Sequence, residues 1–153
     1  MIILKEITKE NLKSIIDLDV SEHQKNQVAT NSVSIAQGHY SNSAWFRGIF
    51  LDNKAIGFVM LDLLQETNQC FLWRFMIDKK YQGKGYGKIA LTQVIDYVKS
   101  LKVYEEIKTS YVPVENGAEG FYKSFGFMDE DSEEIIKDFN LEDSGEIGLK
   151  YLL

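Results

Sequence analysis

The chain has 153 residues, with 23 acidic and 17 basic side chains, one cysteine and a formal net charge of -6. This length and a hydrophobic content of 44% fit one globular domain with a buried core and exclude a disordered chain. A single cysteine excludes a disulfide framework, and the acidic balance disfavours sequence-independent binding of nucleic acid.

The apolar spacing predicts the secondary structure of the first half of the chain. We expect a strand over 1–7, a helix over 9–19 with Thr8 as its N-cap, and a helical stretch over 21–41 that is broken near 30–32. Three strands follow, at 45–51, 55–65 and 68–78. The turn at Asp52-Asn53 joins the first two of these strands as a hairpin.

The second half alternates helices and strands. A glycine-rich loop leads into a helix that ends near residue 101, and the elements after it are a strand over 106–113, a helix over 116–124 and a strand over 147–152. Residues 133–138 are expected to add a helical turn. This order predicts a mixed α/β (α+β) fold in which helices flank one sheet.

Neither a signal peptide nor an apolar run of the roughly 18–20 residues that a membrane helix needs is recognisable in the sequence. We therefore expect a cytoplasmic protein with no membrane partner. Without an internal repeat or a linker-like segment, residues 1–153 are expected to form a single domain. The two histidines are sixteen positions apart and lack a third ligand, so no metal site is predicted.

The charge is unevenly distributed along the chain. Residues 78–88 hold four lysines against one aspartate, a net +3, which leaves -9 for the remaining residues. Residues 129–146 alone hold nine acids and one lysine. This pattern suggests a local site for an anion in a protein that otherwise attracts cations.

The basic segment contains the glycine-rich loop, from Gln82 to Lys88. Glycines let the backbone approach a ligand closely, and the N–H groups at a helix start carry partial positive charge, so the loop predicts a phosphate site. The spacing matches neither a Walker loop nor a dinucleotide fingerprint. The alternative is a glycine-rich helix entry with solvated lysines.

Two motifs resemble the GNAT acetyltransferase superfamily, whose ligand is acetyl-CoA. The spacing Gln82-x-x-Gly85-x-Gly87 resembles its pyrophosphate-binding loop, and residues 116–127 resemble its Asn-x-x-Ala-x-x-Leu/Phe-Tyr-x-x-x-Gly-Phe segment. The second match departs in one place, because the family's asparagine position falls on Glu115 and Asn116 comes one residue later. Residues 24–37 and 72–78 are similar to bacterial spermidine/spermine (diamine) N-acetyltransferases.

The resemblance implies a GNAT-like, mostly antiparallel sheet and direct transfer of an acetyl group from acetyl-CoA to a primary amine. The expected acceptor is a polyamine such as spermidine or spermine. The alternatives are a protein N-terminus or lysine, or a non-catalytic CoA-binding module. A homodimer is compatible with the resemblance, although no sequence pattern demonstrates an interface. The implied CoA-binding residues are Phe75, Met76, Ile77, Gln82, Gly83, Lys84, Gly85, Tyr86, Gly87, Lys88 and Asn116.

Tyr122 maps onto the family's tyrosine and is expected to be the general acid, because a phenol can protonate a departing thiolate. A primary ammonium has a pKa of about 10.4 and must lose a proton before attack. Three carboxylates are candidates to accept that proton, with Glu66 as our choice ahead of Asp62 and Glu22. The alternative interpretation is that Tyr122 is a buried aromatic residue in the core, contributed by a short helix.

A cationic acceptor would contact carboxylates and aromatic faces. The predicted acceptor-binding residues are Glu22, Asn31, Asp62 and Trp73. Each also has a structural interpretation, because such carboxylates are usually solvated, an asparagine often caps a helix and a tryptophan is often part of a core.

Overall fold

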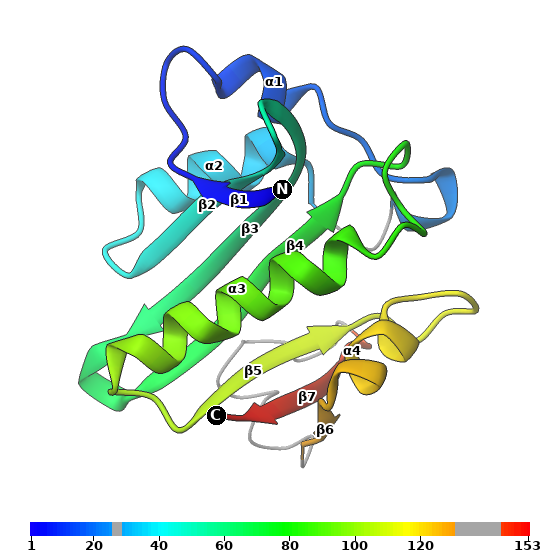
Figure 1. Cartoon of the computed structure of the whole chain (residues 1–153). Coiled ribbons are helices and arrows are strands. Elements are labelled where there is room, and N and C mark those ends of the chain that lie inside the picture. Colours follow the sequence, from blue (N-terminus) through cyan, green and yellow to red (C-terminus); the bar gives the residue numbers. More distant parts are fainter. Residues whose placement is uncertain (26–28, 131–144) are drawn as a thin grey trace.

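The computed structural model describes residues 1–25, 29–130 and 145–153, and these form one seven-stranded sheet in the order β1-β2-β3-β4-β5-β7-β6 (Figure 1). The strands are β1 (Ile2–Lys5), β2 (Ala44–Leu51), β3 (Lys54–Leu64), β4 (Gln69–Ile77), β5 (Glu106–Tyr111), β6 (Met128–Asp129) and β7 (Ile147–Leu152). Neighbours pair antiparallel except β4 and β5, which run parallel. The predicted mixed, mostly antiparallel sheet is confirmed.

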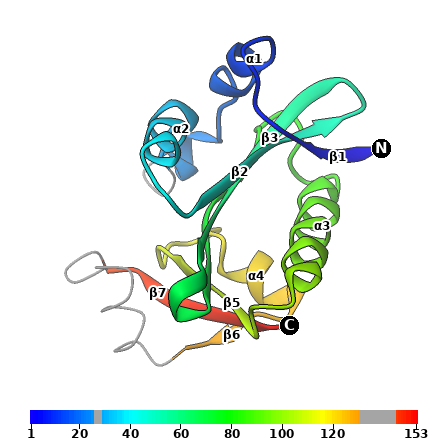
Figure 2. The same cartoon turned by 90° about the vertical axis from the view of Figure 1, so that its left-hand side faces the viewer.

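Helices cover both faces of this sheet (Figure 2). The helices α1 (Leu12–Ile16) and α2 (Asn31–His39) lie on one face, and α3 (Tyr86–Leu101) and α4 (Glu119–Phe125) lie on the other. The described residues also form two short 3-10 turns, η1 (Glu22–Gln24) and η2 (Gln65–Thr67). Within the described residues, no helix is both long enough and apolar enough to span a membrane.

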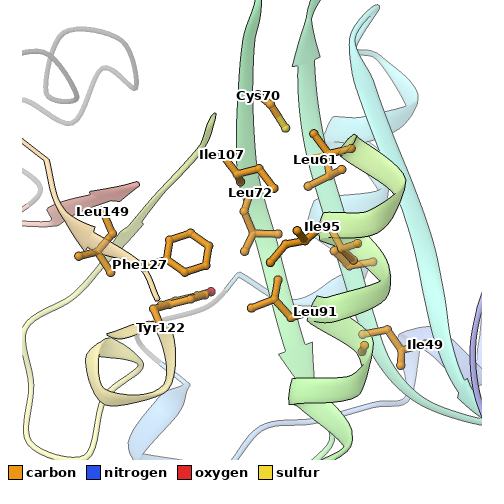
Figure 3. Close-up of a cluster of buried hydrophobic side chains, with 14 of the residues drawn as sticks. Ile49, Leu61, Cys70, Leu72, Leu91, Ile95, Ile107, Tyr122, Phe127 and Leu149 are labelled. Atoms are coloured by element: carbon orange, nitrogen blue, oxygen red, sulfur yellow. The ribbon is translucent and has the colours of Figure 1, made fainter. Parts of the chain in front are cut away.

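The main core lies under α3. Its apolar stripe, which includes Leu91, Val94 and Ile95, packs against the sheet and continues to Tyr122 and Phe127 near α4 (Figure 3). A smaller cluster lies under α1 and α2 and consists of Ile15, Phe50, Phe58, Met60 and Met76. The sheet therefore separates two packed layers, and a ligand that enters between its strands can reach both faces.

The first helix is shorter than predicted. Its N-cap is Asn11 rather than Thr8, because the C=O and the hydroxyl of Thr8 instead close a turn with the N–H of Asn11. Contacts with a distant segment hold the chain just after this helix. The N–H of Asp19 donates to the Asp78 carboxylate (2.9 Å), and the N–H of Lys79 donates to the C=O of Asp19 (2.8 Å). These contacts tie the chain to the loop that follows β4, which a local hydrophobic pattern cannot reveal.

Other boundaries agree to within a few residues. The break expected near 30–32 is the start of α2, where the Thr30 hydroxyl caps the helix by accepting from the N–H of Val33 (3.5 Å). The short strand β6 was not predicted. The helical turn expected over 133–138 lies outside the described residues.

The parallel strands β4 and β5 diverge from one another. Phe71 and Lys108 form a single registered pair, and beside them the Thr109 hydroxyl donates to the C=O of Leu72 (3.1 Å). The β3–β4 register shifts at the same level, so that Trp73 is the extra residue of a bulge. Beyond it, β4 pairs with β3 on one edge and has no β5 partner on the other, and this leaves a gap within the sheet.

Candidate active site

A cavity of about 880 Å³ occupies the gap between β4 and β5. Its walls are the second half of β4, the glycine-rich loop, the start of α3, β5, the segment from β5 into α4 and the residue before β7. Most of the predicted site residues line it: Trp73, Phe75, Met76, Ile77, Gln82, Gly83, Gly85, Tyr86, Gly87, Lys88 and Tyr122.

The glycine-rich loop presents open backbone at the cavity. Gly83 (φ +73°) and Gly85 (φ +83°) have left-handed conformations, and a Cβ at either position would meet nothing within 4 Å. The backbone conformation, not packing, is therefore the reason for these glycines. Gly85 is the N-cap of α3 and provides no side-chain cap, so the first N–H groups of α3 remain for an anion. With Lys88 alongside, this arrangement fits a pyrophosphate.

The Gln82 side chain anchors the loop. Its amide nitrogen donates to the C=O of Ile77 (2.8 Å) and to the side-chain oxygen of Gln24 (2.9 Å). The Ser21 hydroxyl donates to the Gln82 amide oxygen (3.5 Å). Because its side-chain amide is bonded to β4 and η1, Gln82 holds the loop in position. Its backbone, and not its side chain, is then available to bind a phosphate.

The unpaired edge of β4 offers polar backbone groups to the cavity. The N–H of Asp78 donates to the C=O of Ile56 (2.7 Å), so residue 78 faces β3. Because antiparallel strands alternate between paired and outward-facing residues, Ile77 and Phe75 direct their N–H and C=O groups to the opposite edge. The bond from Gln82 to the C=O of Ile77 agrees with this alternation. A ligand in the gap can take the place of a neighbouring strand along this edge.

Tyr122 enters the cavity from α4, with its hydroxyl directed toward Leu72 of β4 (Figure 3). Its ring lies 5.4 Å from that of Phe121 and 5.3 Å from that of Phe127, contacts that fix its orientation. Burial raises the pKa of Tyr122 to about 12, although a hydrogen bond to Thr109 opposes the rise. The phenol therefore stays protonated through the neutral range and can act as a hydrogen donor.

None of the three carboxylates considered as proton acceptors lines the cavity. Glu66 lies in the exposed turn η2, at the opposite end of β4 from the glycine-rich loop. The carboxylate of Asp62 accepts from the Ser43 hydroxyl, and Glu22 is exposed and forms an ion pair with Lys25 (2.7 Å). The structure thus does not bring these residues to the place where an amine would react.

Asn31 is a structural residue and not part of the cavity, contrary to the expectation from sequence. It is 4% exposed, and its amide donates to the C=O of Ile15 (2.8 Å) and lies 3.6 Å from the sulfur of Met76. The side chain ties α2 to the C=O of Ile15, which also accepts from the N–H of Leu18 (3.3 Å), beside the small core cluster.

Two predicted CoA-binding residues also lie off the cavity wall. Asn116 is exposed in the turn before α4 (φ +58°), and the adjacent Gly117 and Ala118 line the cavity instead. Lys84 projects over the ring of Tyr81, with its nitrogen 5.8 Å from the ring centre. Both therefore flank the site from outside.

Sequence reasoning missed a polar group of residues on the α1–α2 side of the cavity. The Ser110 hydroxyl donates to Glu146 (3.2 Å), and the Arg74 guanidinium donates to the C=O of Trp73 (2.8 Å) and to Gln37 (3.4 Å). Burial lowers the pKa of Arg74, and Glu146 opposes this. Glu146 belongs to the acidic run noted in the sequence, and the pairing of β5 with β7 is what brings it to the cavity.

The sequence model of the acetyltransferase (GNAT) family matches residues 8–127, which include the glycine-rich loop, the unpaired edge of β4 and Tyr122. The chain belongs to the GNAT acetyltransferase family. It is therefore an N-acetyltransferase that depends on acetyl-CoA, as the two sequence motifs indicated.

Two curated relatives are similar over most of the chain. A probable spermine N(1)-acetyltransferase of Bacillus subtilis subsp. natto is 31% identical over 134 residues, which cover 82% of this chain and 86% of the relative. A spermine/spermidine N(1)-acetyltransferase of Bacillus subtilis strain 168 is 30% identical over the same shares. The PaiA N-acetyltransferase of Thermoplasma acidophilum, solved with coenzyme A, shares the fold with a TM-score of 0.73, 17% identity and coverage of 100% and 99% of the two chains.

Proposed function

We propose that this GNAT acetyltransferase acetylates a primary amine of a small polyamine such as spermidine or spermine. The observation that carries the acceptor class is the 30–31% identity to two relatives named for spermine or spermidine, over 82% of the chain. The indole of Trp73 on the cavity wall supports it, because aromatic faces attract ammonium groups and pack on methylenes.

The donor is held by backbone. The N–H groups from Gly83 to Lys88 bind the pyrophosphate, and the outward backbone groups of Phe75 and Ile77 bind the amide-containing arm. When bound, acetyl-CoA supplies the acetyl group as a thioester. An N–H on the unpaired edge of β4 polarises the acetyl carbonyl oxygen.

Tyr122 holds a proton on its hydroxyl oxygen and gives it to the sulfur of the leaving thiol. The phenol remains protonated in the neutral range because burial has raised its pKa. Donation by a positioned acid accelerates such reactions by about 10²- to 10⁴-fold. The acceptor loses its own ammonium proton to solvent water before attack, and the proposal assigns Glu66, Asp62 and Glu22 no contact with the reacting amine.

The test is thiol release from acetyl-CoA with a panel of spermidine, spermine, an aminoglycoside and a peptide with a free N-terminus. We expect spermidine or spermine to give the highest kcat/KM. Preference for the peptide would replace the polyamine with a protein acceptor. If no amine raises thiol release while CoA still increases the melting temperature, the chain is a CoA-binding module and the proposal fails.

A further inference from the structure

One point on β5 is flanked by two polar groups on opposite faces of the sheet. Thr109 and Ser110 are consecutive residues in this strand, so their side chains point to opposite faces. The Thr109 hydroxyl bonds to Tyr122 and to the C=O of Leu72, on the face covered by α3 and α4. The Ser110 hydroxyl donates to Glu146, on the other face. Tyr122 and Glu146 therefore lie toward opposite faces of the sheet, and both line the cavity.

Glu146 also brings a negative charge to this part of the cavity. Among the described residues that line the cavity it is the one carboxylate, and it is half-buried. The lining cations are Lys88, which belongs to the loop at the start of α3, and Arg74. A cationic acceptor that avoids the loop thus finds its opposite charge at Glu146. Partial burial strengthens that attraction compared with a solvated carboxylate.

We infer that Glu146 binds the ammonium group of the acceptor and holds it on the face of the sheet opposite Tyr122. The inference rests on the proposed acetylation of a cationic amine. It places the incoming amine and the acid that serves the leaving thiol on opposite sides of the acetyl group. Ser110 is then a positioning residue, because its hydroxyl fixes the carboxylate.

Arg74 is the competing partner of that carboxylate. Glu146 opposes the lowering of the Arg74 pKa, so the two charges lie within electrostatic reach. The guanidinium is tied to the C=O of Trp73 and to Gln37, and these bonds hold it toward α2. If Arg74 selected the acceptor instead, it would favour an amine that carries a carboxylate, and the experiment must separate these two cases.

The test compares Glu146→Gln with Glu105→Gln, the same chemical change at an exposed residue outside the cavity. We measure kcat and KM for spermidine at saturating acetyl-CoA, and KM for acetyl-CoA at saturating spermidine. Because a hydrogen bond to a charged group is lost, Glu146→Gln should raise the KM for spermidine about 10- to 100-fold. Its KM for acetyl-CoA and its melting temperature should stay unchanged. Glu105→Gln should leave every value unchanged.

Three results would overturn the inference. The first is a KM for spermidine in Glu146→Gln within twofold of wild type. The second is a parallel rise of both KM values, which indicates a distorted cavity. The third is a wild-type preference for lysine over cadaverine, its analogue without the carboxylate, since that preference assigns selection to Arg74.

Failure of the proposed function gives a different result. If wild-type protein shows no amine-dependent thiol release, calorimetric titration of spermidine into the CoA-loaded protein still tests Glu146. Binding that Glu146→Gln weakens at least tenfold, and Glu105→Gln does not, supports the ammonium site without turnover. The absence of spermidine binding to the wild-type protein overturns it.

Discussion

Removal of the Tyr122 hydroxyl is the most direct test of the chemistry in the gap. Tyr122→Phe keeps the ring between Phe121 and Phe127 and deletes the oxygen alone. The pKa shift from 10.0 to about 12 corresponds to about 3 kcal/mol in favour of the protonated phenol. At pH 9 roughly one molecule in a thousand is ionised, so the wild-type rate should show no loss from Tyr122 ionisation up to that pH.

We expect kcat of Tyr122→Phe to fall about 10²- to 10⁴-fold with the KM for acetyl-CoA nearly unchanged. The low-dielectric pocket also disfavours a thiolate, so the proton affinity of the leaving sulfur rises together with that of the phenol. Loss of the hydrogen bond to Thr109 should cost about 1 kcal/mol of stability, or about 2–4 °C in melting temperature. A large kinetic effect with a small thermal one is therefore the expected result.

The assay is steady-state thiol release over pH 6–9, with thermal unfolding of the same samples. Tyr104→Phe is the matched control, because Tyr104 has the same 7% exposure, lies outside the cavity and has a hydroxyl with no hydrogen-bond partner within the described residues. It should turn over at the wild-type rate. Unchanged turnover of Tyr122→Phe would refute the acid role.

Three further predictions concern stability. A Cβ at Gly57 would lie 2.5 Å from the carbonyl oxygen of Met76, so Gly57→Ala should lower the free energy of unfolding by about 3 kcal/mol in urea titrations. The control is Gly120→Ala in α4, where a Cβ would meet nothing within 4 Å, and this change should be neutral or slightly stabilising. Burial raises the pKa of Cys70 from 9.0 to about 12, so the unfolded chain loses the thiol proton at a lower pH than the folded protein. The free energy of unfolding should therefore fall between pH 9 and 12, by up to about 1.4 kcal/mol per pH unit. Cys70→Ala should flatten that alkaline decline, and an equally steep decline in the variant would contradict the prediction. Asn31→Ala should cost about 1–3 kcal/mol of unfolding free energy and leave the KM for spermidine unchanged, and a selective KM effect would restore it as an acceptor residue.

Local rules determine which predicted donor-side residues line the cavity, and a sequence displays such rules. Backbone conformation requires Gly83 and Gly85, and Gly85 is also the N-cap of α3; both features belong to a short segment of sequence. The strands could also be predicted, since runs of apolar residues mark β2, β3 and β4. Tyr122 came from a motif of fixed spacing.

The acceptor side could not be predicted in this way. Glu66 and Glu146 are both glutamates near strand ends, and neither residue type nor local position distinguishes them. Glu146 reaches the cavity because β7 pairs with β5, while Glu66 is carried to the far end of β4. The buried place of Asn31 is not visible in the sequence for a related reason, because its partner is a backbone carbonyl sixteen residues away at Ile15. Long-range pairing decides these positions, and one sequence does not display it.

The divergence of β4 and β5 has a consequence for the lifetime of the protein. Strands β1–β4 and strands β5, β7 and β6 are two antiparallel sub-sheets that meet through one registered pair. A donor bound in the gap in the proposed way would bond to the exposed edge of the first sub-sheet and contact the second, and would thereby hold the two sub-sheets together. At a hundred times its Kd it would add about 2.7 kcal/mol to the free energy of unfolding. Resistance to proteolysis should therefore increase with the concentration of acetyl-CoA, and amide hydrogen exchange at Phe75 and Ile77 should become slower.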